Sequence, residues 1–183
     1  MILEIKRLEE VLDHLETNHE KTKPKTVKNG WRIDNPHQLN EFKLIRIHLF
    51  NLCKKCLIED QKLDIADRPL LLSSWLNVHR NSGYNIIHHH GNSLLSGVLY
   101  LEAPEGSGTL ELIDPRPGTT FRPNLGFNAL GGDHLSYAVE PKQGLAILFP
   151  GYLQHFVNPA DFREESKRRS SIAFNMDIGT TDP

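Results

Sequence analysis

Cysteine is almost absent from this sequence, and its scarcity argues against two kinds of small protein. Cys53 and Cys56 are the only cysteines among 183 residues. Two cysteines are too few for the disulfide framework of a small secreted domain, and a single CxxC without a second pair does not predict a zinc site. Because the pair lies inside a helical pattern, we expect two small core or boundary residues and a reducing, cytoplasmic location.

Long apolar runs and a strong net charge are also missing. The longest apolar runs are LAILF (145–149) and LLL (70–72), far short of the roughly 20 residues that cross a bilayer. The opening MILEIKRLEEVLDHLE is charged every few positions and lacks a small-residue cleavage site, so we expect no signal peptide and no membrane contact. The net charge is -2 and KRR (167–169) is the main basic run, which argues against nucleic acid as a partner.

Two helices are predicted in the first third of the chain. Residues 2–16 repeat leucine and valine at helical spacing on one face. A polar loop is expected over 19–30. The second helix is expected to start with Asn35 as its N-cap and Pro36 in its first turn, and to run to about Ile58.

From residue 70 the segments shorten, and glycine and proline separate them. We predict strands at 71–79, 84–90, 95–102, 108–113, 135–139, 144–149, 155–158 and 169–177. Two helices followed by about eight short strands indicate a mainly β jelly-roll barrel buttressed by two helices. We expect one compact domain, with a helical support region at 1–69 and a β core at 70–183. The loop 115–134 is long enough to border a site as a lid, and we expect His134 within it to be structural or exposed to solvent.

Three consecutive histidines stand in one predicted strand, YNIIHHHG. Successive strand side chains point to opposite faces, so His88 and His90 share a face and His89 points away. Their Cα atoms are then roughly 6.6 Å apart, and two imidazoles at that spacing can reach one ion through bonds of about 2.1 Å. A hydrogen-bonded histidine cluster at the barrel mouth is the alternative. Isoleucine stands on both faces of this strand, so we expect it to be buried on both sides.

A third histidine follows in GLAILFPGYLQHFVNP (144–159). A jelly roll places strands that are distant in sequence beside one another, so His155 can face the HxH pair. Histidine is the commonest metal ligand in proteins. We therefore predict that His88, His90 and His155 are metal ligands and form the catalytic centre.

An arginine and a serine in KRRSSIAFNMDIG share one face of the last predicted strand. Arg169 offers a planar fork of donors that fits a carboxylate, and Ser171 adds a hydroxyl. Beside three candidate metal ligands, this pair predicts the binding of an acid. Arg168 points to the other face, and we expect it at the surface.

The β-rich part of the chain contains, in this order, HxH, a distant histidine and R-x-S fourteen residues later. In this arrangement the chain resembles the Fe(II)- and 2-oxoglutarate-dependent oxygenase superfamily. The closest likeness is to small prolyl-hydroxylase-like oxygenases of marine bacteria and their phages. It covers roughly residues 73–177, through SWLNV, YNIIHHHGNSLLSGVLYLEAP, GTLELIDPR, PKQGLAILFPGYLQHFVNP and RSSIAFN.

The resemblance implies a double-stranded β-helix and an enzyme that hydroxylates an unknown peptide or small molecule. Its cofactors would be Fe(II), 2-oxoglutarate and O₂, with 2-oxoglutarate decarboxylated to succinate. His88 and His155 match the first and last iron ligands of the family. Arg169 matches the residue that holds the far carboxylate of 2-oxoglutarate, with Ser171 assisting and Tyr100 matching a strand tyrosine that bonds the same group.

His90 departs from the family pattern, which has aspartate or glutamate at this position. Three neutral imidazoles leave the charge of Fe(II) uncompensated, so the site depends more on an anionic cosubstrate. Asp114 or Glu111 is an alternative source of a carboxylate ligand, although no spacing argument favours either.

Two other functions stay open. One is a cupin-type three-histidine metal dioxygenase that does not use 2-oxoglutarate, and the other is a jelly-roll module that binds a metal or ligand without turnover. We expect Asn77, Asn85 and Gln154 to make ordinary strand-end hydrogen bonds, with the orientation of substrate or of the metal ligands as the alternative. We expect Trp75 and Phe174 to lie in the core, and the chain to be a monomer or homodimer.

Overall fold

One long strand, β2 (Leu70–His88), organises the fold because it pairs with three other strands along its length. The computed structural model describes residues 2–22, 25–65, 68–116 and 136–179. The other strands are β1 (Val27–Asp34), β3 (Leu95–Glu102), β4 (Leu110–Ile113), β5 (Ser136–Val139), β6 (Ala146–Pro150), β7 (His155–Val157) and β8 (Arg169–Ile178). The helices are α1 (Ile2–Asn18) and α2 (Lys43–Lys55), with 3-10 turns at Pro36–Gln38 and Asn40–Phe42 and a π turn at Cys56–Asp60.

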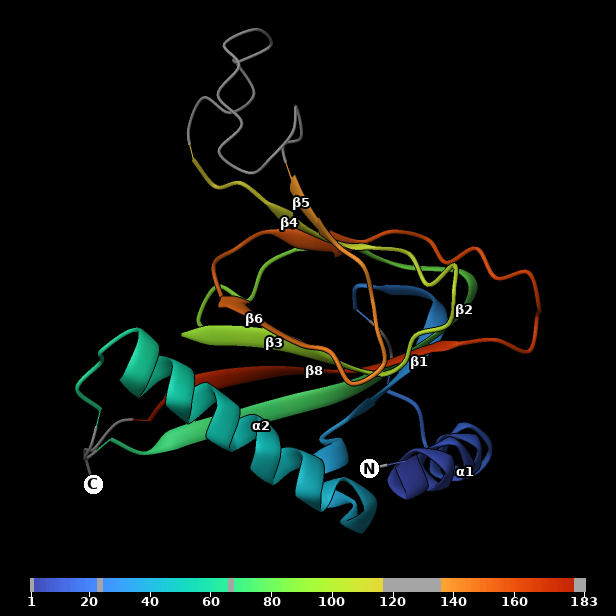
Figure 1. Ribbon diagram of the computed structural model, residues 1–183, viewed down its shortest axis with the longest axis horizontal. Helices are drawn as coiled ribbons and strands as arrows, with labels where there is room; N and C mark the ends of the chain where they lie inside the picture. The colour runs from blue at the N-terminus through green and yellow to red at the C-terminus, as the bar shows by residue number, and fades with distance from the viewer. Residues whose placement is uncertain (1, 23–24, 66–67, 117–135, 180–183) are drawn as a thin grey trace, which may run out of the picture.

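The strands form one antiparallel sheet that bends into a half-barrel (Figure 1). Its order is β5-β4-β7-β2-β8-β3-β6, with β1 added on β2. The first half of β2 pairs with β8, whereas its last residues pair with β7. The strand β2 therefore belongs both to the part of the sheet that contains β8 and to the part that contains β7, and it connects these two walls of the half-barrel. The predicted fold class, a mainly β half-barrel with two helices, is confirmed.

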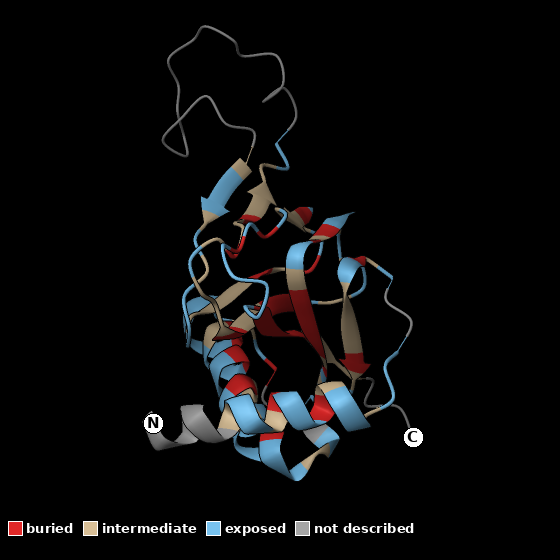
Figure 2. Ribbon diagram, turned by 90° about the vertical axis from the view of Figure 1, so that its right-hand side faces the viewer, coloured by how far each residue is buried: buried red, intermediate tan, exposed pale blue. Residues whose placement is uncertain are grey.

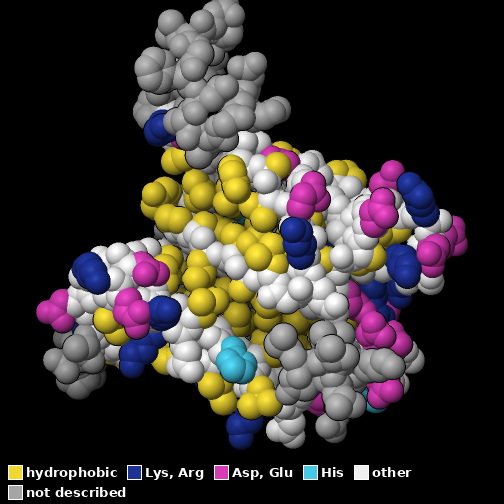
Figure 3. All heavy atoms as spheres, in the orientation of Figure 1, with side chains coloured by type: hydrophobic (Ala, Val, Ile, Leu, Met, Phe, Trp, Pro, Cys, Tyr) yellow, Lys and Arg dark blue, Asp and Glu magenta, His cyan; other side chains and the backbone are white. Residues whose placement is uncertain are grey.

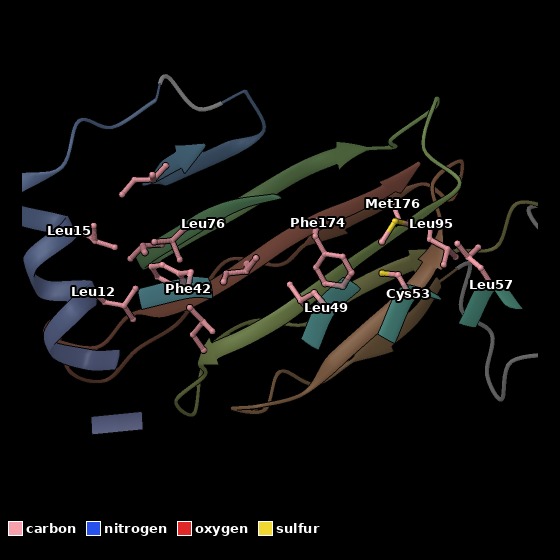
Figure 4. Close-up of a cluster of buried hydrophobic side chains, with 14 of the residues drawn as sticks. Leu12, Leu15, Phe42, Leu49, Cys53, Leu57, Leu76, Leu95, Phe174 and Met176 are labelled. Atoms are coloured by element: carbon pink, nitrogen blue, oxygen red, sulfur yellow. The ribbon is translucent and has the colours of Figure 1, made fainter. Parts of the chain in front are cut away.

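The helices cover the outer face of the sheet and bury its apolar side chains. Figure 4 shows Leu49 and Cys53 of α2 close to Phe174 and Met176 of β8, and all four are at most 3% exposed. Figure 2 shows that the helices keep an exposed outer surface while the strands behind them are buried. Burying one such leucine contributes roughly 1.5–3 kcal/mol. The predicted core position of Cys53 is confirmed, and burial raises the pKa of its thiol to about 12.

Alternation along β2 and β8 separates the two faces of the sheet. Leu76 and Val78 point outward into the helix-covered core. Trp75, Asn77 and His79 point inward, opposite Ala173, Ser171 and Arg169 of β8. The polar side chains of these two strands are therefore gathered on the inner wall of the half-barrel.

The structure corrects the predicted start of the second helix and the end of the predicted loop. Asn35 adopts the left-handed conformation with φ of 54° and makes no side-chain cap bond, so two 3-10 turns precede a helix that begins at Lys43. The polar loop predicted over 19–30 is wrong from Val27 onward, where β1 pairs with β2. The region 1–69 is therefore not helical throughout, and its boundary with the β core stays a prediction.

The two strands predicted at 71–79 and 84–90 are one strand, because NSG (81–83) does not reverse the chain. The pairing with β1 shifts register between Lys28 and Gly30, so residues 80–83 lie opposite Asn29 as a bulge. Past this bulge Ile86 and Ile87 are 41% and 54% exposed, so the prediction of a strand buried on both faces is wrong here.

Arg168 is not the surface residue that the sequence suggested. Its guanidinium is 8% exposed and lies on the outer face of the sheet against α1. There it donates to Glu102 at 2.7 Å and forms ion pairs with Asp13 and Glu16.

Charged side chains of both signs are interspersed on the face shown in Figure 3, around an apolar centre. Within the described ranges, no helix is long and apolar enough to cross a membrane.

Candidate metal centre and anion pocket

Three imidazoles meet where the end of β2 lies beside the start of β7. The β2–β7 pairing places His88 directly opposite His155, and His90 follows two residues after the end of β2. The ring centroids are 5.2 Å apart for His88 and His90, 4.3 Å for His88 and His155, and 5.1 Å for His90 and His155. One ring nitrogen from each lies within 4.8 Å of the other two. The structure therefore brings together the three residues that the sequence predicted as ligands.

Hydrogen bonds on the opposite side of each ring fix its tautomer. Nδ1 of His88 is 2.7 Å from the carbonyl oxygen of Ile86, and Nδ1 of His155 is 2.9 Å from that of Leu153. A carbonyl only accepts, so Nδ1 is protonated and donates in both rings. Nε2 then carries a free lone pair and is the nitrogen able to bind a metal ion, as in metal sites where the other ring nitrogen is held by a carbonyl or carboxylate.

His90 is held by side chains instead of by a carbonyl. Its Nδ1 is 2.6 Å from Oδ1 of Asn175 and 2.9 Å from Oγ of Ser96, and Ser96 itself donates to Asn175 at 2.9 Å. Since Oδ1 of Asn175 is an acceptor, Nδ1 of His90 donates here too. A dedicated polar support thus orients the one residue that departs from the family pattern.

All three imidazoles are neutral at physiological pH. Burial lowers the pKa of His88, His90 and His155, in the last case to about 3. The neighbouring rings lower it further, while the Nδ1 hydrogen bonds oppose the shift. Neutral nitrogen is the form that binds a metal ion.

A polar pocket extends from the histidines along the inner wall of the half-barrel. Cross-strand neighbours form three rows on this wall, and all of them line the pocket. The rows are Trp75 with Ala173 and Val98, Asn77 with Ser171 and Tyr100, and His79 with Arg169. The ring of Trp75 lies 5.3 Å from that of His90, so the first row is beside the histidines and the Arg169 row is the most distant.

Arg169 is a buried cation without an acidic partner among the described residues. It is 1% exposed, and within the described ranges its hydrogen-bond acceptors are carbonyl oxygens. Nη1 donates to Ser107, with Gly108 and Asn158 at 3.5 Å, and Nη2 donates to Gly83 at 3.3 Å. Burial lowers the pKa of Arg169 to about 10. A buried charge needs a counterion, so this arrangement favours an anion in the pocket. Within the described ranges these hydrogen bonds come from Nη1 and Nη2, and none comes from Nε.

Unsatisfied polar atoms surround the same end of the pocket. The hydroxyl of Tyr100 and Oδ1 of Asn77 are buried without a partner among the described residues. Burial raises the pKa of Tyr100 to about 12, so its hydroxyl keeps its proton and can donate. Ser171 stands between these two residues in its row. Arg169, Tyr100 and Ser171 therefore provide the donors that a carboxylate requires, and the residues fit a diacid whose other end reaches a metal.

Other predicted residues have different outcomes. Phe174 lies in the core, whereas Trp75 lines the pocket with the guanidinium of Arg32 4.6 Å from its ring, so its assignment to the core is wrong. Asn85 lines the pocket and donates to Thr26 at 3.2 Å, while Gln154 is exposed.

Neither carboxylate considered as an alternative ligand joins the histidine cluster within the described residues. Glu111 accepts hydrogen bonds from Thr109, Ser136 and Asn158, and Asp114 forms an ion pair with Arg116. His134 and the loop that contains it lie outside the described residues, apart from residues 115 and 116.

Sequence reasoning missed His79. It has the same strand parity as Trp75 and Asn77, and this parity was the signal that would have placed it on the pocket wall.

Comparisons with known proteins bear on the family and the fold of the chain. A family model described as "Putative 2OG-Fe(II) oxygenase" matches residues 73–175. No curated protein matches the sequence. A solved prolyl-4-hydroxylase from Pseudomonas putida is 16% identical with a TM-score of 0.66, and the alignment covers 97% of this chain and 87% of that one.

Two further structures have bound molecules in their descriptions. HygX from Streptomyces hygroscopicus, with nickel and 2-oxoglutarate bound, is 14% identical with a TM-score of 0.62, covering 95% of this chain and 78% of that one. A prolyl hydroxylase from Trichoplax adhaerens, in complex with a hypoxia inducible factor peptide fragment, is 14% identical with a TM-score of 0.60, covering 95% and 76%. Such low identities establish the double-stranded β-helix fold alone. The narrower likeness to proteins of marine bacteria and phages finds no support.

Proposed function

The chain belongs to the 2OG-Fe(II) oxygenase family, and from this premise we propose that it is a dioxygenase that hydroxylates a peptide or small molecule while 2-oxoglutarate is decarboxylated to succinate. The observation that carries the proposal is Arg169, a buried cation at the end of a pocket that begins at three neutral imidazoles, with no acidic partner in the part of the chain that the structure describes. A diacid that bound a metal at the imidazoles with one end and Arg169 with the other would provide a ligand for the metal and a counterion for the arginine.

His88, His90 and His155 would hold Fe(II) through Nε2, because each Nδ1 is already committed to an acceptor. The iron, when bound, supplies the activation of O₂ and of the keto acid. The protein contributes rigid placement of the ligands. His88 and His155 are paired across two strands, and Asn175 and Ser96 hold His90 in its orientation.

Arg169 would bind the far carboxylate through Nε–H and Nη2–H, with Tyr100 and Ser171 as further donors. The carbonyls of Ser107 and Gly83 hold the remaining edge of the guanidinium, so the fork that faces the pocket is oriented before the diacid arrives. Preorganised charged donors in a site that excludes water bind an anion strongly.

The charge of the pocket favours a dianion over a neutral ligand. Three imidazoles add no charge to Fe(II), and Arg169 adds one more positive charge. No acidic side chain is among the residues that line the described pocket. Replacement of the usual carboxylate by His90 thus increases the attraction for 2-oxoglutarate.

The direct test is turnover without any added substrate. The protein is purified without oxygen, loaded with Fe(II), mixed with 2-oxoglutarate and exposed to O₂ while succinate is measured. We expect succinate to form slowly, at a rate that depends on iron and disappears in H155A. A protein that retains iron but forms no succinate would contradict the proposal.

The three-histidine ligand set also favours one second candidate, a cupin-type metal dioxygenase that does not use 2-oxoglutarate. In that enzyme Arg169 would not contact a cosubstrate, so R169A would consume O₂ with its substrate as fast as the wild type. A module that binds metal without turnover would hold iron and consume no O₂.

A further inference from the structure

His79 is a buried histidine that the proposed chemistry does not use. It is 1% exposed, and within the described ranges neither ring nitrogen has a hydrogen-bond partner. The side chain lines the pocket and is not one of the three clustered imidazoles. A buried polar group that is left unsatisfied costs roughly 1–3 kcal/mol, so a ligand that satisfies it would recover this cost.

The sheet places His79 beside Arg169. The two residues are direct partners in the β2–β8 register, so their side chains leave the same face of the sheet with Cβ atoms about 4.5–5.5 Å apart. His79 is therefore at the end of the pocket where the anion is expected, four residues along β2 from the Trp75 row that contacts the histidine cluster.

Gly83 holds both side chains in place. A Cβ atom added at Gly83 would lie 2.7 Å from Cβ of His79 and 2.8 Å from the carbonyl oxygen of Arg80, so the backbone of Gly83 packs closely against the base of the His79 side chain. The carbonyl oxygen of Gly83 accepts from Nη2 of Arg169. The bulge at residues 80–83 thus fixes the histidine and the arginine relative to each other.

The imidazole is neutral in this position. Burial lowers the pKa of His79 to about 3 and the charge of Arg169 lowers it further. The backbone of Tyr84 and the side chain of Asn85 lie near enough to oppose the shift, but neither has the geometry of a hydrogen bond to the ring. A neutral imidazole has one N–H donor and one acceptor nitrogen. It can therefore donate to an anion without placing a second positive charge beside Arg169.

We infer that His79 is a further binding residue of the anion pocket, whose ring N–H donates to the same carboxylate as Arg169 and so selects 2-oxo diacids over 2-oxo monoacids. This inference rests on the proposed function. His79 adds a donor from β2 to Arg169 and Ser171 on β8 and Tyr100 on β3, so that three strands hold the carboxylate.

The test compares two ligands that differ only at the far end. Binding of 2-oxoglutarate and of 2-oxopentanoate, which has the same chain length without the second carboxylate, is measured by anaerobic titration of the Fe(II)-loaded protein. We expect H79F to bind 2-oxoglutarate at least tenfold more weakly than the wild type and to bind 2-oxopentanoate with an affinity within threefold of the wild type. H79Q, which keeps an N–H donor, is expected to lose less.

The control is V78A, which alters the neighbouring buried residue on the opposite face of β2 and should leave both affinities unchanged. If H79F lost affinity equally for both ligands, or lost no affinity for 2-oxoglutarate, the inference about His79 would be overturned and the proposed function would stand. A wild-type protein that binds iron but not 2-oxoglutarate would overturn the proposed function as well.

A second measurement does not depend on the folding of H79F. In wild-type protein loaded with Zn(II), the ¹⁵N resonances of the His79 ring should shift with 2-oxoglutarate and stay in place with 2-oxopentanoate. Unchanged resonances with a saturating diacid would contradict the contact.

Discussion

Replacing Arg169 by methionine removes the proposed anchor of the diacid and retains most of the side-chain volume. The proposed function assigns two of its N–H groups, on Nε and Nη2, to the carboxylate, and each hydrogen bond to a charged group contributes roughly 1.5–3 kcal/mol. Loss of both therefore costs at least about 3 kcal/mol of binding free energy, which raises Kd by about 100-fold or more. R169K keeps the charge without the planar fork, and we expect an intermediate loss of about tenfold.

The assay is calorimetric titration of 2-oxoglutarate into metal-loaded protein without oxygen. The substitution also leaves the carbonyls of Ser107 and Gly83 without a donor, so thermal unfolding is measured in parallel and binding is compared well below the unfolding temperature. In the wild type, 2-oxoglutarate at about 100 times Kd should stabilise the fold by about 2.7 kcal/mol, and in R169M by almost nothing.

The adjacent residue provides a matched control. Arg168 is also buried and bound to carboxylates, but it lies on the outer face against α1 and does not line the pocket. R168M should lower stability and leave the affinity for 2-oxoglutarate unchanged. If R169M bound the diacid within threefold of the wild type, the reasoning from the buried cation would be refuted.

Three further predictions follow from the same structure. H90A should lose Fe(II), whereas H90D should retain it, as measured by metal content after gel filtration. The control is His89→Ala, because His89 is exposed. Retention of Fe(II) by H90A would show that His90 is not a ligand. N175L removes the acceptor that orients His90 and should weaken metal affinity by roughly 10- to 100-fold in a competition assay, while an unchanged affinity would refute that role. Because the pKa of His79 is lowered to about 3 in the folded state, His79 binds a proton between about pH 6.5 and 3 only when the protein is unfolded. The free energy of unfolding therefore decreases as the pH is lowered below 6.5. In denaturant titrations of metal-free protein this fall should be steeper in the wild type than in H79Q, by about 1.4 kcal/mol per pH unit, and equal slopes would contradict the buried neutral state.

The histidine cluster could be predicted from the sequence because strand parity is a local property. His88 and His90 needed only the alternation of side chains, and Arg169 and Ser171 needed the same rule on another strand. The position of His155 opposite His88 required the further assumption of a jelly roll, which the β2–β7 pairing confirms. What these residues bind stays a prediction.

The errors come from places where tertiary contacts override local signals. NSG (81–83) has the composition of a turn, yet pairing with β1 keeps the chain extended around a bulge. The strand β1 itself was missed because its sequence, VKNGWRID, is polar and its pairing partner is more than forty residues away. Asn35 and Pro36 read as a helix start, but the left-handed conformation of Asn35 delays the α-helix to Lys43.

Trp75 and His79 show why the pocket was only partly predicted. An aromatic residue in a strand reads as core, and a single histidine gives no indication of a ligand. Strand parity groups both with Asn77 on one face of β2, but only the register between β2 and β8 shows that this face lines the pocket beside Ala173 and Arg169.

The most direct measurement of the central claim is the charge-transfer absorption of the anaerobic protein with Fe(II) and 2-oxoglutarate. This band requires that the keto acid chelates an iron ion that the protein holds. We predict that it appears with one equivalent of iron in the wild type, is lost in H155A, and needs at least about 100-fold more 2-oxoglutarate in R169M. Absence of the band in wild-type protein that contains iron and excess 2-oxoglutarate would contradict the account.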